Sequence, residues 1–277
     1  MIARLHCGRF RLPLERPLVM GVVNVTPDSF SDGGRFLEPA AAIAHAYKLI
    51  EEGADLVDIG AESSRPGAAA VVSADEELRR LLPVLRGLRD APVPVSIDTV
   101  KPQVMRAALA EGAAMINDIN ALLAPCALAA VVSSDAAVCL MHMQGTPGTM
   151  QQQPHYADVV AEVKAFLQER VRAARDAGIA LERIAIDPGF GFGKTLEHNL
   201  ELLRHLREFR ALGVPLLAGW SRKSSLGKIT GKPAGDRLAA SIAAALIAAQ
   251  NGAGILRVHD VAATRDALSV LAAVDKT

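Results

Sequence analysis

Aromatic residues, net charge and cysteines are all scarce in this chain of 277 residues. Phe, Trp and Tyr together make up only 4% of it, whereas hydrophobic residues make up 51%, so aliphatic side chains must build most of the core. The 30 basic residues balance the 30 acidic ones. This balance excludes the charged surface expected of a general nucleic-acid binder or a polybasic membrane binder. We therefore expect ligands that are small molecules.

The three cysteines, Cys7, Cys126 and Cys139, are odd in number and far apart. No CxxC spacing suggests a zinc site or a redox pair, so we expect a reducing, cytoplasmic location. Residues 1–17 carry charges throughout, and we expect no signal peptide there. The most apolar run, residues 238–249, is too short to span a bilayer and indicates a buried or subunit-packing helix.

Short apolar runs rich in β-branched residues alternate with longer segments along the chain. In the longer segments, such as residues 157–178, apolar positions recur every three or four residues, a spacing that predicts helices. Eight βα units of this size predict an α/β fold, a (β/α)8 TIM barrel with a short N-terminal extension, in one domain spanning residues 1–277. A doubly wound open sheet is the alternative. The eight expected strands are residues 19–25, 55–61, 94–99, 115–120, 137–143, 184–189, 215–220 and 255–260.

Polar residues stand at the ends of these expected strands. Because parallel barrel strands end at the same rim, these residues should share the C-terminal mouth, where TIM-barrel active sites form. Any one of them could merely close a loop or cap a helix, but that explanation is weak for the whole set. The set comprises Asn24, Glu62, Ser64, Arg65, Asp98, Asn117, His142, Asp187, Ser221 to Lys223, Arg257 and His259.

The charges of this set indicate two kinds of ligand. Asp98, Asp187 and an Asn amide suit a flat, donor-rich heterocycle, because charge-assisted hydrogen bonds are worth roughly 1.5–3 kcal/mol each. We expect apolar residues to line this pocket, namely Ile97, Ile186, Met141 and Ile119. A second, cationic group suits a phosphate or pyrophosphate, with Mg²⁺ held partly by phosphate oxygens. It comprises Arg65, Arg257 and His259, together with Asn24.

The stretch IDPGFGFGKT, residues 186–195, resembles a nucleotide-binding P-loop at first sight, but Pro188 stands where that loop has its first glycine. We interpret it as a mouth loop after the sixth strand, whose glycines allow the backbone and Phe190 to approach the substrates. Lys194 would either contact substrate or tie this loop to the next helix. His142 fits a buried core residue as well as a ligand contact. Lys223 could also be the Schiff-base lysine of a barrel aldolase.

Eight sequence blocks, taken in order, resemble the signature blocks of the dihydropteroate synthase family over nearly the whole chain. The first block and the SRKS motif are the most specific. The resemblance implies a (β/α)8 barrel, and a folate-pathway transferase that joins 6-hydroxymethyl-7,8-dihydropterin pyrophosphate to 4-aminobenzoate and releases pyrophosphate. It also implies a homodimer. The blocks are GVVNVTPDSFSDGGRF (21–36), DIGAESSRPGA (58–68), SIDT (96–99), INDIN (116–120), MHMQGTPGTMQ (141–151), IDPGFGFGKT (186–195), GWSRKSSLG (219–227) and LRVHDV (256–261).

The resemblance also implies roles for individual residues. The pterin pocket would comprise Asp98, Asn117, Asp187 and Lys223, with Met141 and Ile119 beside them. The pyrophosphate site would comprise Asn24, Arg257 and His259, with Mg²⁺ at Asn24 and with Arg65 closing over the reacting end. The aminobenzoate pocket would comprise Phe30, Ser64, Arg65, Pro66, Phe190, Lys223 and Ser224. Ser64 stands where the family usually has Thr, which removes a methyl group and should alter packing against the aminobenzoate ring.

The implied chemistry needs no covalent nucleophile. Pyrophosphate can leave first because the dihydropterin ring shares the positive charge, and the neutral aryl amine is already reactive. The catalytic set would be Asp98, Asp187, Lys223, Arg257, His259 and Arg65, which stabilise charge at the two ends of the substrate. The loops at residues 26–36 and 62–71 would close over the site. Two alternatives from other classes are a pterin-binding methyltransferase module and an inactive synthase paralogue.

Overall fold

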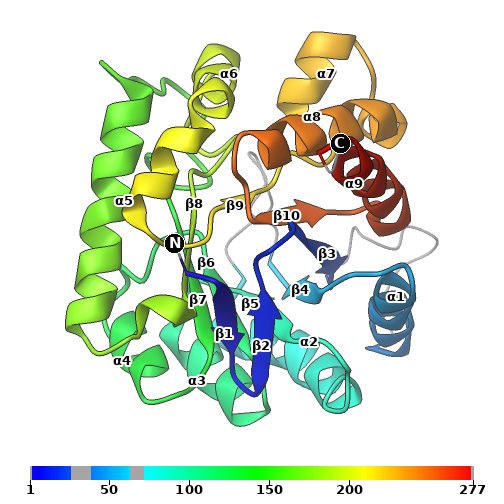
Figure 1. The fold of residues 1–277 in the computed structure, drawn as a ribbon. Helices are drawn as coiled ribbons and strands as arrows, with labels where there is room; N and C mark the ends of the chain where they lie inside the picture. The colour runs from blue at the N-terminus through cyan, green and yellow to red at the C-terminus, as the bar shows by residue number, and fades with distance from the viewer. Residues whose placement is uncertain (1, 26–38, 63–71, 276–277) are drawn as a thin grey trace.

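The computed structural model describes residues 2–25, 39–62 and 72–275. Eight parallel strands form a sheet in the order β8-β7-β6-β5-β4-β3-β10-β9. A parallel bridge between Ile186 and Leu216 joins the two edges of this sheet, so that it curls into a barrel (Figure 1). The strands are β3 (Leu18–Asn24), β4 (Leu56–Gly60), β5 (Val95–Asp98), β6 (Met115–Asp118), β7 (Ala137–Met141), β8 (Ile184–Asp187), β9 (Leu217–Ala218) and β10 (Ile255–Val258).

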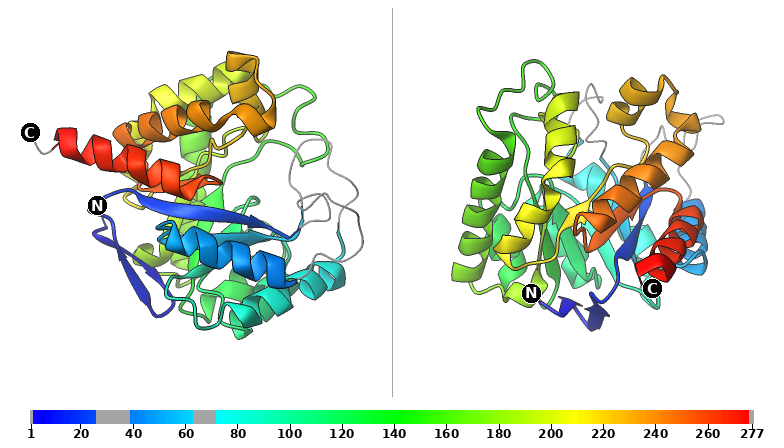
Figure 2. Two further views of the ribbon diagram at one scale, coloured as in Figure 1. Left: turned by 90° about the vertical axis from the view of Figure 1, so that its right-hand side faces the viewer. Right: turned by 45° about the horizontal axis from the view of Figure 1, so that its top comes forward.

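Helices surround the barrel in both orientations of Figure 2. Each of the eight runs expected to be strands contains one, so the predicted TIM barrel is confirmed and the open-sheet alternative is wrong. The helices are α1 (Pro39–Glu51), α2 (Ala74–Gly87), α3 (Pro102–Ala110), α4 (Ala127–Val132), α5 (Val159–Asp176), α6 (Leu196–Arg204), α7 (Ser224–Thr230), α8 (Leu238–Gln250) and α9 (Val261–Asp275). Short 3-10 turns lie at Leu181–Arg183, Leu206–Leu212 and Ala234–Asp236.

Several helices begin where a side chain accepts a hydrogen bond from a free backbone N–H. Ser73 accepts from Glu76 N before α2, and Asp158 accepts from Ala161 N before α5. Thr195 caps α6 in the same way, which satisfies donors that the helix cannot pair internally. Within the described part of the chain, no helix is both long and apolar enough to cross a membrane.

The predicted N-terminal extension is a hairpin of β1 (Arg4–Cys7) and β2 (Phe10–Pro13). Leu5 and Cys7 are fully buried against side chains from the first residues of the barrel strands, such as Leu18 and Met115. Gly8 N donates to Asp135 O at 2.9 Å, which ties the hairpin turn to the loop before β7. The hairpin therefore closes the N-terminal end of the barrel and leaves the opposite end for ligands (Figure 2).

Successive residues of each barrel strand face opposite sides. Met115, Cys139 and Ala185 pack in the barrel interior, whereas Ile97 and Ile186 pack with the surrounding helices. The expectation that Ile97 and Ile186 line the ligand pocket is therefore wrong. Each precedes an aspartate in its strand, so the isoleucine and the aspartate point to opposite faces.

Candidate active site

Polar side chains gather inside the barrel at the ends of β3 to β6. The strand register places Asn24 beside Gly60, Gly60 beside Asp98, and Asp98 beside Asn117. Asp187 ends β8 in the equivalent position, next to Met141 of β7. The structure thus brings the predicted heterocycle-binding residues to one rim of the barrel.

Arg257 of β10 joins two carboxylates at this rim. Its Nε donates to Asp58 Oδ2 at 2.6 Å, and its Nη2 donates to Asp98 Oδ2 at 3.1 Å. Asn117 Nδ2 donates to the same Asp58 oxygen at 3.0 Å. Asp58 therefore orients both the arginine and the asparagine through a single carboxylate oxygen, Oδ2.

Asp58 is a site residue that the sequence reasoning missed. It lies in the middle of the apolar strand β4 and is fully buried. Its Oδ1 has no hydrogen-bond partner among the described residues. The signal in the sequence was a charged side chain inside an otherwise apolar strand. Burying a carboxylate without a partner is costly, so such a residue should have a partner inside the barrel.

Burial and neighbouring charges shift the pKa values of the ionisable groups at this rim. Burial raises the pKa of Asp98 to about 7, although Arg257 opposes this, and the carboxylate of Asp58 adds to the rise. Burial also raises the pKa of Asp187, against the effect of Lys223. Burial alone would lower the pKa of Arg257, but Asp58 and Asp98 raise it overall, so the guanidinium stays charged. The side chains of Arg257 and Asp98 are 23% and 17% exposed, so a ligand entering at the mouth can reach both.

Lys223 lies after β9 and points at the loop that follows β8. Its ammonium donates to Phe190 O and lies 4.9 Å from the centre of the Phe192 ring. Burial lowers the pKa of Lys223 to about 8, while Asp187 opposes this. Phe190 is buried and packs on Trp220, with ring centres 5.0 Å apart. A charged amine, an aromatic edge and a carboxylate therefore lie within one part of the mouth.

The loop after β8 runs close to the end of β7. Gly189, Gly191 and Gly193 all have positive φ angles, of 72°, 80° and 62°. A Cβ at position 189 would overlap with the His142 carbonyl oxygen, so only glycine fits there. Asp187 Oδ1 accepts from Gly189 N at 2.7 Å, which fixes the carboxylate to its own loop. The stretch is therefore the loop that follows a barrel strand at the mouth, as predicted, whereas Phe190, which was predicted to approach the substrates, is only 1% exposed.

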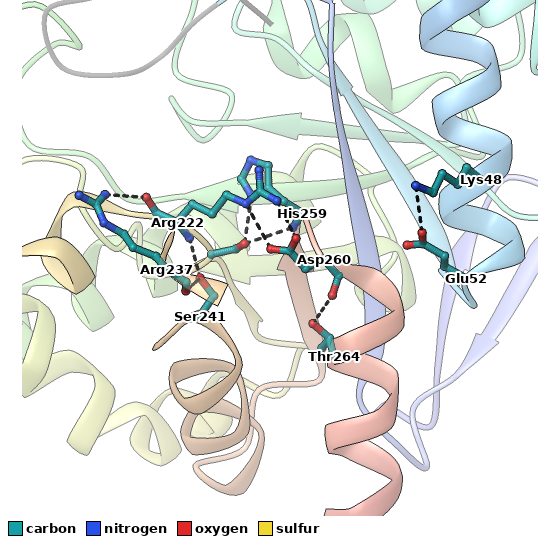
Figure 3. A network of polar contacts seen from close by, with 9 residues as sticks. Lys48, Glu52, Arg222, Arg237, Ser241, His259, Asp260 and Thr264 are labelled. Atoms are coloured by element: carbon teal, nitrogen blue, oxygen red, sulfur yellow. Dashed lines mark hydrogen bonds and ion pairs between the residues drawn. The ribbon is translucent and has the colours of Figure 1, made fainter. Parts of the chain in front are cut away.

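His259 lies two residues beyond Arg257, at the start of α9. Its Nδ1 lies 3.0 Å from Ser221 Oγ, and its backbone N donates to the same oxygen at 3.2 Å. The neighbouring Asp260 accepts from Arg222 Nη2 at 2.6 Å (Figure 3). Arg222 adopts a φ of 59°, and the Ser241 hydroxyl accepts from its backbone N at 3.0 Å. These contacts fix the turn between Ser221 and Lys223.

Comparison with known proteins identifies this arrangement. Residues 20–259 match a family model described as a pterin binding enzyme. The dihydropteroate synthase of Escherichia coli (strain K12) is 49% identical over 263 residues, which cover 95% of this chain and 93% of that protein. The chain belongs to the dihydropteroate synthase family. Its members are transferases of folate biosynthesis, so the protein is an enzyme of that class.

Solved structures of the family agree with the fold. A dihydropteroate synthase of Xanthomonas albilineans with 4-aminobenzoic acid is 56% identical, superposes with a TM-score of 0.94, and matches over 100% of both chains. A structure of the enzyme from the same organism with 7,8-dihydropteroate is 54% identical, with a TM-score of 0.90 and 99% of each chain covered.

Some of the remaining predicted site residues lie within the described part of the chain, and others lie outside it. Met141 and Ile119 are buried next to the carboxylates, at the end of β7 and just past β6. Ser224 is exposed at the start of α7. Phe30, Ser64, Arg65 and Pro66 lie outside the described residues, as do most of the residues of the two loops expected to close over the site.

A dihydropteroate synthase that uses Mg²⁺ would need oxygen ligands near its anion site. Among residues 2–25, 39–62 and 72–275, no group of three His, Cys, Asp or Glu could hold a metal ion. Asn24 offers one amide oxygen at the end of β3. Mg²⁺ commonly keeps waters and shares phosphate oxygens of the substrate, so a single protein oxygen fits a metal that arrives with pyrophosphate.

Proposed function

We propose that this protein condenses 6-hydroxymethyl-7,8-dihydropterin pyrophosphate with 4-aminobenzoate, giving 7,8-dihydropteroate and pyrophosphate. The observation that carries the proposal is the position of Arg257, which binds Asp58 and Asp98 and shares its strand end with His259. One guanidinium thereby connects the carboxylates suited to a pterin with the residues suited to an anion. Family members solved with 4-aminobenzoic acid and with 7,8-dihydropteroate support the choice of substrates.

The pterin is recognised by acceptors and donors in fixed positions. Asp98 and Asp187 accept hydrogen bonds from ring nitrogens and the amino group, whereas Asn117 and Lys223 donate to ring acceptors. Burial raises the pKa of both aspartates because their ionised forms are poorly hydrated. A positively charged ligand that donates hydrogen bonds to them replaces this lost hydration and stabilises the ionised forms. Met141 and Ile119 supply apolar surface for the ring faces.

The anion end takes the pyrophosphate. Arg257 and His259 donate to its oxygens, and Asn24 would hold Mg²⁺. When bound, Mg²⁺ supplies additional positive charge to the leaving group. Arg65 completes this end according to the family resemblance.

In the reaction, the bond between the pterin methylene carbon and the pyrophosphate oxygen breaks, and its electron pair leaves with pyrophosphate. The dihydropterin ring shares the resulting positive charge, which Asp98 and Asp187 stabilise. The amine nitrogen of 4-aminobenzoate then forms the new bond to the methylene carbon, and the nitrogen loses a proton. Phe190, Lys223 and Ser224, with Phe30, Ser64, Arg65 and Pro66, position the amine and keep water away from the cation.

The protein works as a homodimer in the cytoplasm under this proposal. Leu238 and Ile247 on α8 are 46% and 45% exposed, and Val270 on α9 is 67% exposed. Burying them against a second copy would remove this apolar surface from water.

The roles are tested by replacing Arg257 and an arginine outside the site. Dihydropteroate formation is measured with both substrates and Mg²⁺ for Arg257→Ala and for Arg204→Ala, whose side chain is 65% exposed on α6. We expect the first variant to lose product formation and the second to keep it. Equal activity in the two variants would contradict the role of Arg257.

A further inference from the structure

Four successive backbone carbonyls in the loop after β8 each accept a hydrogen bond from a different side chain. The donors come from the turn after β9, from the segment between β7 and α5, and from the loop itself. This density of side-chain donors fixes the backbone path of residues 190–193. The pairs are Lys223 with Phe190 O, Gln151 Nε2 with Gly191 O at 2.6 Å, Lys194 Nζ with Phe192 O at 3.0 Å, and Tyr156 Oη with Gly193 O at 2.8 Å.

Lys194 is the most deeply buried of these donors, and no carboxylate among the described residues forms an ion pair with it. Its side chain and backbone together are only 3% exposed. Its ammonium lies 3.0 Å from His142 Nδ1 and 3.4 Å from His142 O, besides its bond to Phe192 O. A lysine is seldom buried without a counter-charge, so the three acceptors must compensate for its lost hydration.

His142 is suited to accept from this lysine. Burial, and then the charge of Lys194, lower the pKa of His142 to about 3, so the ring is neutral and its Nδ1 is free to accept a hydrogen bond. The edge of the Phe166 ring packs on it at 4.9 Å between ring centres, with an interplanar angle of 88°. Burial lowers the pKa of Lys194 to about 7, and Asp187 opposes this.

The contact between Lys194 and His142 joins the end of β7 to the loop after β8, and the two segments are tightly packed. Position 189 lies directly against the His142 carbonyl oxygen, and position 193 lies against that of Gln144. If Lys194 no longer held Phe192 O, the loop could move only away from β7, toward the mouth. Phe190 and its contact with Lys223 would move with it.

We propose that Lys194 and His142 form a buried positioning pair that holds residues 190–193 against the end of β7 and thereby sets the affinity for the aromatic amine. This inference rests on the proposed function, in which Phe190 and Lys223 shape the aminobenzoate pocket. The pterin carboxylate Asp187 is held by its place in β8 and by Gly189 N, and the charge of Lys194 also acts on it. Lys223 serves both pockets, but only the aminobenzoate pocket also takes its shape from residues 190–193, so the pair acts on one substrate more than on the other.

The test compares three variants of the full-length protein. Lys194→Met removes the donor and keeps a long apolar chain, His142→Leu removes the acceptor, and His142→Asn keeps an acceptor close to the Nδ1 position. Lys48→Met, at an exposed lysine on α1, is the matched control. For each, the KM for 4-aminobenzoate is measured with saturating pterin pyrophosphate, and the Kd of 6-hydroxymethylpterin is measured by calorimetry.

We expect Lys194→Met and His142→Leu to raise the KM for 4-aminobenzoate about tenfold, equivalent to about 1.4 kcal/mol, with a smaller rise in the pterin Kd. His142→Asn should restore most of the aminobenzoate affinity, and Lys48→Met should match the wild type. An unchanged KM in a folded variant, or an equal loss for both ligands, would overturn the inference. If Lys194→Met does not fold, the KM for 4-aminobenzoate and the pterin Kd of the two His142 variants test the inference.

The same assay separates this inference from the proposed function. A wild-type protein that forms no dihydropteroate would overturn the proposed function. A wild type that is active, with variants that keep the wild-type KM, would overturn the positioning pair alone.

Discussion

Asp58 offers the sharpest test of how the site is assembled. Replacing it with Asn keeps the shape of the side chain but removes the charge that faces Arg257 Nε at 2.6 Å. A hydrogen bond to a charged group contributes roughly 1.5–3 kcal/mol and a neutral one about 1 kcal/mol, so about 1–2 kcal/mol of Arg257 orientation is lost. Arg257 keeps its bond to Asp98 at 3.1 Å, which limits the effect.

We therefore expect Asp58→Asn to lower kcat/KM for the pterin pyrophosphate about fivefold to thirtyfold, since 1.4 kcal/mol corresponds to about one factor of ten. Thermal stability should also fall, because the replacement breaks a buried ion pair and Arg257 keeps only its bond to Asp98 among the described carboxylates. The assay is steady-state turnover at varied pterin pyrophosphate and saturating aminobenzoate, with thermal unfolding followed on the same samples.

Asp55→Asn is the matched control, because Asp55 is also an arginine-paired carboxylate beside β4 but lies at the opposite end of the barrel. It accepts from Arg16 at 2.8 Å and from Val19 N at 2.8 Å, and it also pairs with Arg265. Its replacement should lower stability and leave kcat/KM unchanged. A kcat/KM for Asp58→Asn within about twofold of the wild type, or an equal fall in both variants, would refute the reasoning.

Three further predictions concern pH, the mouth loop and assembly. Because the pKa of Asp98 is about 7 and its ionised form binds the pterin, pterin affinity should fall about tenfold from pH 8 to pH 6, whereas Asp98→Asn should show a smaller change by calorimetry. Gly189→Ala should cost more than about 3 kcal/mol of unfolding free energy, because its Cβ would overlap with His142 O. Gly112→Ala, with open space and a φ of 98°, should cost only about 1–2 kcal/mol in the same denaturant titration. Ile247→Asp should convert a dimer to a monomer in sedimentation analysis, and a wild-type monomer would contradict the proposed assembly.

The barrel could be predicted because its strands are covered on both faces. Strands such as β3 and β7 therefore appear as continuous apolar runs. The β9 strand is shorter than its run, at Leu217–Ala218, since only these two residues pair with β10. The β1 and β2 strands were expected only as an extension, because four-residue strands with exposed Arg4 and Arg11 carry little periodic signal.

The site could be predicted only in part, for reasons of side-chain direction and distance along the chain. Asp58 was missed, and Ile97 was wrongly assigned to the pocket, because an apolar run does not show which of its residues face inward. The alternation of strand side chains from Asp98 would have placed Ile97 on the opposite face. The pairing of Lys194 with His142 spans 52 residues, and no local pattern reports a contact of that kind.

The most direct test of the account is the stoichiometry of wild-type turnover. The purified protein is incubated with 6-hydroxymethyl-7,8-dihydropterin pyrophosphate, 4-aminobenzoate and Mg²⁺, and both dihydropteroate and pyrophosphate are quantified. We predict that the two products form in equal amounts and that dihydropteroate formation requires the aminobenzoate. Failure to form dihydropteroate, or pyrophosphate release far in excess of it with saturating aminobenzoate, would contradict the assignment of the barrel mouth to this condensation.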